Sequence, residues 1–268
     1  MLNFELLFAR GPLMNKPLFL LIFSMLNMYG KDLMNNVKIK KIIDLTHTLT
    51  AESPTWDGSC GFDLPTTSDY HESTSETKFK RQAMHLKKTG IGTHIDAPLH
   101  CFPAKAAAAD LPLEQLCVTG CVIDVSSKAS SDYLISVDDI TSFEESHGII
   151  QENTLVIVYT GWSKYWHDSK KYRNENKQGI MQFPSFSAEA AQLLIKRNVA
   201  GIAIDTLSPD CPNSGYPVHR IMLSNNKYII ENIAYCDQLP PVGTYVIALP
   251  LKINATEAPL RIIGLIIE

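Results

Sequence analysis

Short apolar runs alternate with helix-like patterns along this chain. The runs predict strands at 39–49, 79–88, 121–125, 154–159, 199–204, 228–233, 244–250 and 260–267. Two helices are predicted between them, one capped by Ser136 and ending near Gly148, the other capped by Ser187 and covering 188–197. Because strands and helices alternate in the central part, we expect an α/β layer whose sheet is at least partly parallel.

The segments between these elements are irregular. Residues 54–65 form a loop rich in turn formers, and 104–109 and 111–116 are short helical or loop segments. The stretch 162–179 is polar and aromatic, and we interpret it as a lid or a surface excursion.

Composition indicates a globular protein without a nucleic-acid partner. The chain has 268 residues, of which 45% are hydrophobic and 19% are charged, so it can bury a substantial core. Its net charge is −4, and no basic run interleaved with aromatic residues occurs. Nucleic-acid binding therefore has no support.

The N-terminal segment resembles a leader more than a folded element. Residues 14–30 carry Lys16 ahead of an apolar run, as a short signal peptide does, but no small-x-small cleavage site follows. The run is too short to span a bilayer comfortably. Met34 is a plausible alternative start. We expect 1–33 to be a leader or an over-extended start and 34–268 to be a single cytoplasmic domain, with export as the alternative.

The six cysteines do not form a recognisable zinc or disulfide framework. Cys117 and Cys121 are separated by three residues, but no second pair completes a zinc ribbon, so we expect mostly reduced core thiols. Cys101 beside His100 leaves a Cys-His nucleophile pair open, although neighbouring side chains on an extended chain point apart. No serine lies in a Gly-x-Ser-x-Gly elbow, which argues against a serine hydrolase.

Residues 92–100, Gly-Thr-His-Ile-Asp-Ala-Pro-Leu-His, carry the strongest chemical signal. On a strand the side chains of His94 and Asp96 would share a face, roughly 7 Å apart along it. Pro98 argues against a helix here, and His100 follows where the chain can turn back. Two imidazoles and a carboxylate suit a divalent metal. The alternative is a strand end with two hydrogen-bonded histidines and a turn aspartate.

This stretch resembles the signature His-x-Gly-Thr-His-x-Asp-x-x-x-His of the metal-dependent cyclase-like hydrolases, which include bacterial kynurenine formamidase and isatin hydrolase. Further similar landmarks are 44–47, 54–56, 160–162 and 201–206, together with His219 and Glu231, whose separation of twelve matches the family's second metal-binding pair. The resemblance implies the swivelling β/β/α fold, an α/β fold with a mixed sheet and flanking helices. It also implies a homodimer.

By this resemblance four residues would bind the metal: His94, Asp96, His219 and Glu231. His100 would donate and accept protons. Imidazole and carboxylate ligands suit zinc and manganese. The family's first signature histidine is Gly90 here, so we expect one ion rather than two. Glu231 lies within an apolar strand, where an unpartnered carboxylate is costly; pairing with Arg220 or exposure at a sheet edge is the alternative to metal binding.

Five other residues are expected around this site. Trp56 resembles the family's substrate-contacting tryptophan and suits stacking against an aryl ring, although it could also anchor its loop. Asp205, Ser208 and the nearby Asp210 end a strand and could bond to the ligands, or simply form a turn. His47 is expected to support the site.

The predicted function is hydrolysis of a small amide, most like arylformamidase, which converts N-formylkynurenine to kynurenine and formate. The first alternative keeps the chemistry and changes the substrate to the isatin lactam or another cyclic amide. The second is a catalytically silent protein of the same family that binds a metal or small molecule.

Overall fold

The computed structural model describes residues 38–72 and 74–268. Contacts divide the chain into two units, and residues 40–267 form the larger one. The smaller unit, residues 1–39 with Glu268, lies almost wholly outside the described residues, as do the predicted leader at 1–33 and the alternative start at Met34. No helix among the described residues is both long and apolar enough to cross a bilayer.

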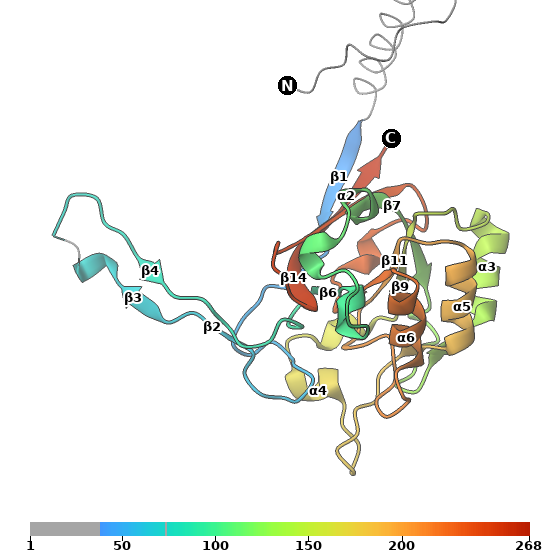
Figure 1. Ribbon diagram of the computed structural model, residues 1–268, viewed down its shortest axis with the longest axis horizontal. Helices are drawn as coiled ribbons and strands as arrows, with labels where there is room; N and C mark the ends of the chain where they lie inside the picture. Colours follow the sequence, from blue (N-terminus) through green and yellow to red (C-terminus); the bar gives the residue numbers. More distant parts are fainter. Residues whose placement is uncertain (1–37, 73) are drawn as a thin grey trace, which may run out of the picture. The chain divides into compact units, whose positions relative to one another are not determined.

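A mixed sheet that closes on itself forms the centre of the larger unit (Figure 1). In the described residues its strands are β1 (Ile39–Asp44), β6 (His94–Asp96), β7 (Cys117–Asp124), β9 (Leu155–Tyr159), β11 (Gly201–Ile204), β12 (Tyr228–Glu231), β13 (Thr244–Pro250) and β14 (Glu257–Ile267). Their order is β1-β14-β13-β7-β9-β11-β12-β6, and pairing of β14 with β6 closes the sheet. Strands β7, β9, β11 and β12 run parallel, which confirms the predicted α/β class and mixed sheet.

Both faces of the central strands are buried. In β9, Leu155 and Ile157 pack into the core enclosed by the sheet, whereas Val156 and Val158 pack into a second core outside it. Helices α3 (Val137–His147), α5 (Ala188–Lys196) and α6 (Pro217–Ser224) contribute to this second core (Figure 1). Burial on both faces explains why the strand sequences are continuous apolar runs.

The predicted helix caps are confirmed. The Ser136 hydroxyl accepts a hydrogen bond from the Asp139 amide at 3.2 Å, and the Asp139 carboxylate accepts one from the Ser136 amide at 2.7 Å. This reciprocal pair is a capping box. The Ser187 hydroxyl accepts from the Ala190 amide at 3.1 Å in the same way.

The strand predictions differ most from the structure in two places. The first strand ends at Asp44 rather than at residue 49. Residues 79–88 do not form one strand of the main sheet: β4 (Arg81–Gln82) pairs with β3 (Thr66–Ser68), and β5 (His85–Leu86) pairs with β2 (Phe62–Asp63). The remaining elements are η1 (Tyr70–Glu72), η2 (Pro98–His100), η3 (Ala108–Asp110), α2 (Leu113–Leu116), β8 (Leu134–Ile135), η4 (Trp162–Tyr165), α4 (Ser169–Arg173), β10 (Ser185–Phe186) and η5 (Cys236–Gln238).

The stretch 162–179, which we interpreted as a lid or a surface excursion, is anchored by a small aromatic core. Trp162, Trp166 and Tyr172 are buried and form a separate small core together with Phe183. The indole N–H of Trp162 donates to the carbonyl of Tyr172 at 2.9 Å, so the polar end of the ring is satisfied. The aromatic residues therefore anchor this segment, while Lys164, His167, Lys170 and Lys171 are exposed.

Candidate active site

The site is built on the short strand β6, which lies between β12 and β14. In the antiparallel register Glu231 is opposite His94, and Glu257 is opposite Asp96. Directly opposite residues of paired strands place their side chains on the same face. Ile95, between the two ligand candidates, enters the enclosed core. The register thus gathers one imidazole and three carboxylates on the face turned away from that core.

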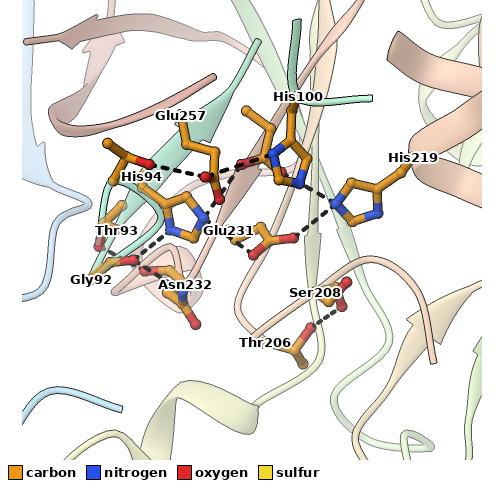
Figure 2. A network of polar contacts seen from close by, with 12 residues as sticks. Gly92, Thr93, His94, His100, Thr206, Ser208, His219, Glu231, Asn232 and Glu257 are labelled. Atoms are coloured by element: carbon orange, nitrogen blue, oxygen red, sulfur yellow. Dashed lines mark hydrogen bonds and ion pairs between the residues drawn. The ribbon is translucent and has the colours of Figure 1, made fainter. Parts of the chain in front are cut away.

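Three of these side chains converge closely enough to hold a metal ion. His94, Asp96 and Glu231 each offer an atom, and these atoms lie within 4.8 Å of one another. Figure 2 shows the side chains of His94 and Glu231 in this cluster. The His94 Nε2 atom lies 3.4 Å from Asp96 Oδ1 and 3.3 Å from Glu231 Oε2. All three residues are buried. The structure thus brings together three of the four predicted ligands in one cluster.

The fourth predicted ligand, His219, approaches from helix α6. Its Nε2 atom lies 3.4 Å from Asp96 Oδ2 and 3.5 Å from Glu231 Oε1. Pro217 opens this helix at its first turn, where a missing N–H costs nothing. The third position of this helix directs His219 at the carboxylates of β6 and β12.

Hydrogen bonds fix which nitrogen of each imidazole faces the site. The His94 Nδ1 atom donates to the carbonyl of Gly92 at 2.9 Å, and the side chain of Asn232 donates to the same carbonyl at 2.9 Å. The His219 Nδ1 atom bonds to Asp210 at 2.7 Å. In both rings Nε2 is therefore the nitrogen directed at Asp96 and Glu231. Imidazole ligands of metals characteristically carry such an outer hydrogen bond.

The buried carboxylates of this cluster favour positive charge on the groups next to them. Burial lowers the pKa of His94, but the neighbouring carboxylates of Asp96 and Glu231 raise it more, so the net pKa is well above the ordinary value. The pKa of His219 is raised well above its ordinary value for the same reason, with Asp210 as the largest raising partner. Burial raises the pKa of Asp96, but the neighbouring imidazoles of His219 and His94 lower it by more, so its net pKa is below the ordinary value.

A divalent cation fits this donor set. Oδ1 of Asp96 is fully buried without a hydrogen-bond partner among the described residues, which is costly for a carboxylate oxygen. Mixed imidazole and carboxylate donors match zinc and manganese. A cation at the convergence of these atoms would satisfy the orphaned oxygen and replace the protons that the two imidazoles otherwise retain.

His100 lies beside this cluster rather than within it. It ends the 3₁₀ turn η2 (Pro98–His100), which follows β6 directly, and the centre of its ring lies 5.7 Å from that of His219 (Figure 2). Its Nδ1 atom lies 3.6 Å from Oε2 of Glu257, and about a third of its side chain is exposed. The neighbouring Cys101 lines the same cavity, and burial raises the pKa of its thiol, which disfavours a thiolate nucleophile.

A cavity of about 540 Å³ opens in front of the cluster. Trp56 and Tyr216 form part of its wall, and their ring centres lie 6.2 Å apart. Trp56 is 39% exposed, and its ring meets Phe183 edge to face at 6.3 Å. The exposed indole therefore stands on the small aromatic core and faces the cavity, as a substrate-stacking ring would.

Asp205, Ser208 and Asp210, which were predicted to support the site, act at different distances from the cluster. The Asp205 carboxylate accepts hydrogen bonds from the amides of Thr160 and Ser163 at 2.9 and 3.1 Å, so it holds the turn after β9 and bonds to none of the four predicted ligands. The Ser208 hydroxyl accepts from the Asp210 amide at 3.1 Å, one step removed from His219. Among these three residues it is Asp210 that bonds directly to a predicted ligand, through Nδ1 of His219.

His47 supports the site through its backbone. Its amide donates to the Thr93 hydroxyl at 3.0 Å, and that hydroxyl donates to the carbonyl of Asn232 at 2.7 Å. These bonds tie the segments carrying His94 and Glu231 to each other. The His47 ring is stacked on Trp166, with ring centres 4.0 Å apart, and its Nε2 atom has no hydrogen-bond partner among the described residues.

Comparison with known proteins assigns the chain to a family. The family model Cyclase, whose description reads "Putative cyclase", matches residues 43–211, and the chain belongs to this family. It is 29% identical over 187 residues to isatin hydrolase of Roseibium aggregatum, covering 65% of this chain and 71% of that one. It is 27% identical over 223 residues to kynurenine formamidase of Erythrobacter litoralis, covering 82% and 91%.

Solved structures agree in fold. The structure of isatin hydrolase A from Labrenzia aggregata bound to benzyl benzoate matches with a TM-score of 0.75 at 29% identity, covering 91% of this chain and all of that one. An isatin hydrolase bound to the product analogue thioisatinate matches with a TM-score of 0.78 at 24% identity, over 92% of this chain and 99% of that one. The cyclase-like hydrolase fold predicted from the sequence is confirmed, and the family is one of metal-dependent hydrolases.

Proposed function

We propose that this chain hydrolyses the C–N bond of a small aryl amide, with a divalent zinc or manganese ion held by His94, Asp96, His219 and Glu231. One observation carries the proposal: both imidazoles bond outward through Nδ1, which leaves their Nε2 atoms converging on two buried carboxylates. When bound, the cation would polarise the scissile carbonyl and lower the pKa of an attacking water toward about 7.

His100 is the residue proposed to move protons. It sits at the cavity edge next to the cluster, and it is partly exposed rather than enclosed among the ligand candidates. Its imidazole would take a proton from the attacking water and return it to the leaving nitrogen as the C–N bond breaks. Such positioned acid-base assistance is worth about 10²–10⁴-fold in rate.

The proposed substrate is an N-formylated aryl amine such as N-formylkynurenine. The aromatic wall formed by Trp56 and Tyr216 offers an apolar surface for the ring, and the cavity of about 540 Å³ accommodates a molecule of this size. Likeness to kynurenine formamidases over 82% of the chain supports this choice. Hydrolysis would release formate and the free amine.

The isatin lactam is the second candidate substrate. Isatin hydrolase of Roseibium aggregatum is 29% identical to this chain, and the isatin hydrolase A structure matches at the same identity. Ring opening of a lactam breaks the same kind of C–N bond, so the residues would have the same roles. The two candidates differ in what the cavity must accept, a flexible formamide or a rigid bicyclic ring.

The test is hydrolysis of both substrates by purified protein loaded with manganese or zinc. The expected result is turnover of one substrate that is abolished by a strong chelator, restored by added metal, and lost in Asp96→Ala. Turnover that survives both chelation and this substitution would contradict the proposal. Binding of about one equivalent of metal without turnover of any aryl amide or lactam would favour a silent, metal-binding member of the family.

A further inference from the structure

Gly90 leaves a space beside the cluster that another side chain fills. A Cβ atom placed on Gly90 would lie 2.1 Å from Oε1 of Glu257 and 3.2 Å from Nε2 of His94. The backbone of Gly90 is not among those with positive φ, so no conformational demand requires glycine here. The space next to His94 that a side chain at position 90 would enter is thus taken by the Glu257 carboxylate.

Strand register brings Glu257 to this place. It begins β14 directly opposite Asp96, and its side chain lies on the same face as the cluster. The Thr89 hydroxyl donates to its Oε2 at 3.0 Å, and His100 lies 3.6 Å from the same oxygen. Figure 2 shows Glu257 between His94 and His100. These partners all engage Oε2, whereas Oε1 is the oxygen beside the Gly90 position.

A second observation indicates that this side of the cluster faces a cation. Oδ1 of Asp96, directly across the strand pair from Glu257, is the buried carboxylate oxygen that lacks a hydrogen-bond partner among the described residues. Its nearest ionic neighbour is Nε2 of His94 at 3.4 Å. The register places the Glu257 carboxylate on the same face as this oxygen of Asp96. The two negative groups repel each other unless positive charge lies between them.

We infer that Glu257 is a metal ligand, coordinating through Oε1 in the place that Gly90 has left free. This inference rests on the metal site of the proposed function and adds a fifth coordinating side chain to it. Compared with a site that has histidine at position 90, this chain would have the anionic oxygen of Glu257 in place of a neutral imidazole. The set then holds three carboxylates and two imidazoles, which favours a harder cation, so the chain should prefer manganese over zinc more strongly than a site with histidine at position 90.

The experiment is an exchange of the two side chains, read by metal binding rather than by activity. Isothermal titration with Mn²⁺ and with Zn²⁺, together with metal content after dialysis, would be measured for the wild-type chain and four variants: Glu257→Gln, Gly90→His, Gly90→His/Glu257→Ala, and Asp96→Ala, which removes a ligand of the proposed site. Glu145→Gln, an exposed carboxylate on α3, is the matched control. Folding is checked by the thermal midpoint of each metal-free protein.

We expect Glu257→Gln to lower Mn²⁺ affinity by at least about tenfold, as loss of groups around a metal commonly does, with little change in the metal-free midpoint. Gly90→His alone should weaken Mn²⁺ binding because its Cβ displaces the Glu257 carboxylate. The double variant should recover binding and shift the Mn²⁺-to-Zn²⁺ affinity ratio toward zinc by about tenfold or more.

Three outcomes overturn the inference, and metal affinity and activity together distinguish them. If wild type binds metal, Asp96→Ala abolishes binding, and Glu257→Gln binds Mn²⁺ like wild type, then Glu257 is no ligand while the proposed site stands. If wild type takes up neither Mn²⁺ nor Zn²⁺, both the metal site and the role of Glu257 are refuted. Activity lost in Glu257→Gln with unchanged metal affinity would also refute coordination, because it would place Glu257 with His100 instead.

Discussion

The Asp210 carboxylate bonds both to the ring and to the backbone of His219. Oδ2 lies 2.7 Å from His219 Nδ1 and accepts from the His219 amide at 2.9 Å, while Oδ1 accepts from the Val218 amide at 2.9 Å. One buried carboxylate therefore caps the first turn of α6 and fixes the rotation of the imidazole that this turn carries. Loss of this residue should loosen the helix and the ligand together.

Asp210→Asn is predicted to lower the affinity for Mn²⁺ or Zn²⁺ by about 10–100-fold. The amide retains only one acceptor oxygen, so at least one of the three donors of α6 loses its partner. The His219 ring then rotates more freely, and its Nε2 atom is held less firmly toward Asp96. Titration calorimetry with each metal would measure the change.

Asp205→Asn is the matched control for this prediction. Asp205 is an equally buried carboxylate that accepts backbone hydrogen bonds five residues earlier, but its partners are Thr160 and Ser163. The control should lower thermal stability and leave metal affinity within about twofold of wild type, since loss of buried hydrogen bonds costs about 1–3 kcal/mol of stability without touching a ligand. Equal loss of metal affinity in both variants would contradict a specific role for Asp210.

Metal should stabilise the folded chain. A cation that binds the folded site and not the unfolded chain adds about 2.7 kcal/mol of stability at a hundredfold excess over Kd. For a domain of this size that is an increase in Tm of about 5–10 °C. Differential scanning fluorimetry with Mn²⁺ would measure it, and Asp96→Ala should remove the shift. An equal shift in that variant would locate the metal elsewhere.

The sequence predicted part of the cluster because its signals are local or lie in the spacing of residues. His94 and Asp96 alternate on a three-residue strand, as their separation of two required. The caps Ser136 and Ser187 begin their helices where predicted, since a cap depends only on the first turn. The pair His219 and Glu231 was available only through resemblance to a family, because nothing local distinguishes them from other buried or loop residues.

Glu257 was missed for a physical reason. Its place beside Gly90 depends on the register between β14 and β6, which are separated by about 160 residues, and on closure of the sheet. Neither can be deduced from apolar periodicity, which says which residues share a face but not which strands are neighbours. The available signal was Gly90 itself, which stands where the family signature has a histidine. A glycine there leaves space that another side chain can occupy.

Trp56→Ala should weaken substrate binding more than it slows turnover. The indole lies beside Tyr216 in the cavity wall, and its ring contacts among the described residues are with Phe183 and Tyr216 rather than with the metal-ligand candidates. Loss of an aromatic stacking surface costs about 1–2 kcal/mol, or roughly 5–30-fold in KM. Steady-state kinetics on N-formylkynurenine and isatin would measure it, with Trp56→Phe as the control that keeps a ring. A fall in kcat with unchanged KM would contradict substrate stacking.

His47 should make folding stability depend on pH. Burial, followed by the charge of His167, lowers the pKa of His47 from 6.5 to about 4. Above about pH 6.5 the ring is neutral in both the folded and unfolded chain, and its full contribution is present. As pH falls from about 6.5 to 4, His47 binds a proton in the unfolded chain but stays neutral in the folded chain. The free energy of unfolding therefore falls, by about 3 kcal/mol in all.

His47→Phe should remove this part of the pH dependence. The phenyl ring can keep the stack on Trp166, whose plane is within 8° of the imidazole plane, and it cannot be protonated. Urea unfolding of metal-free protein at several pH values would give the free energy of unfolding for both chains. The variant should gain about 2–3 kcal/mol relative to wild type between about pH 7.5 and 4.5, because other groups titrate alike in both. Parallel curves would show that His47 is not held neutral by its surroundings.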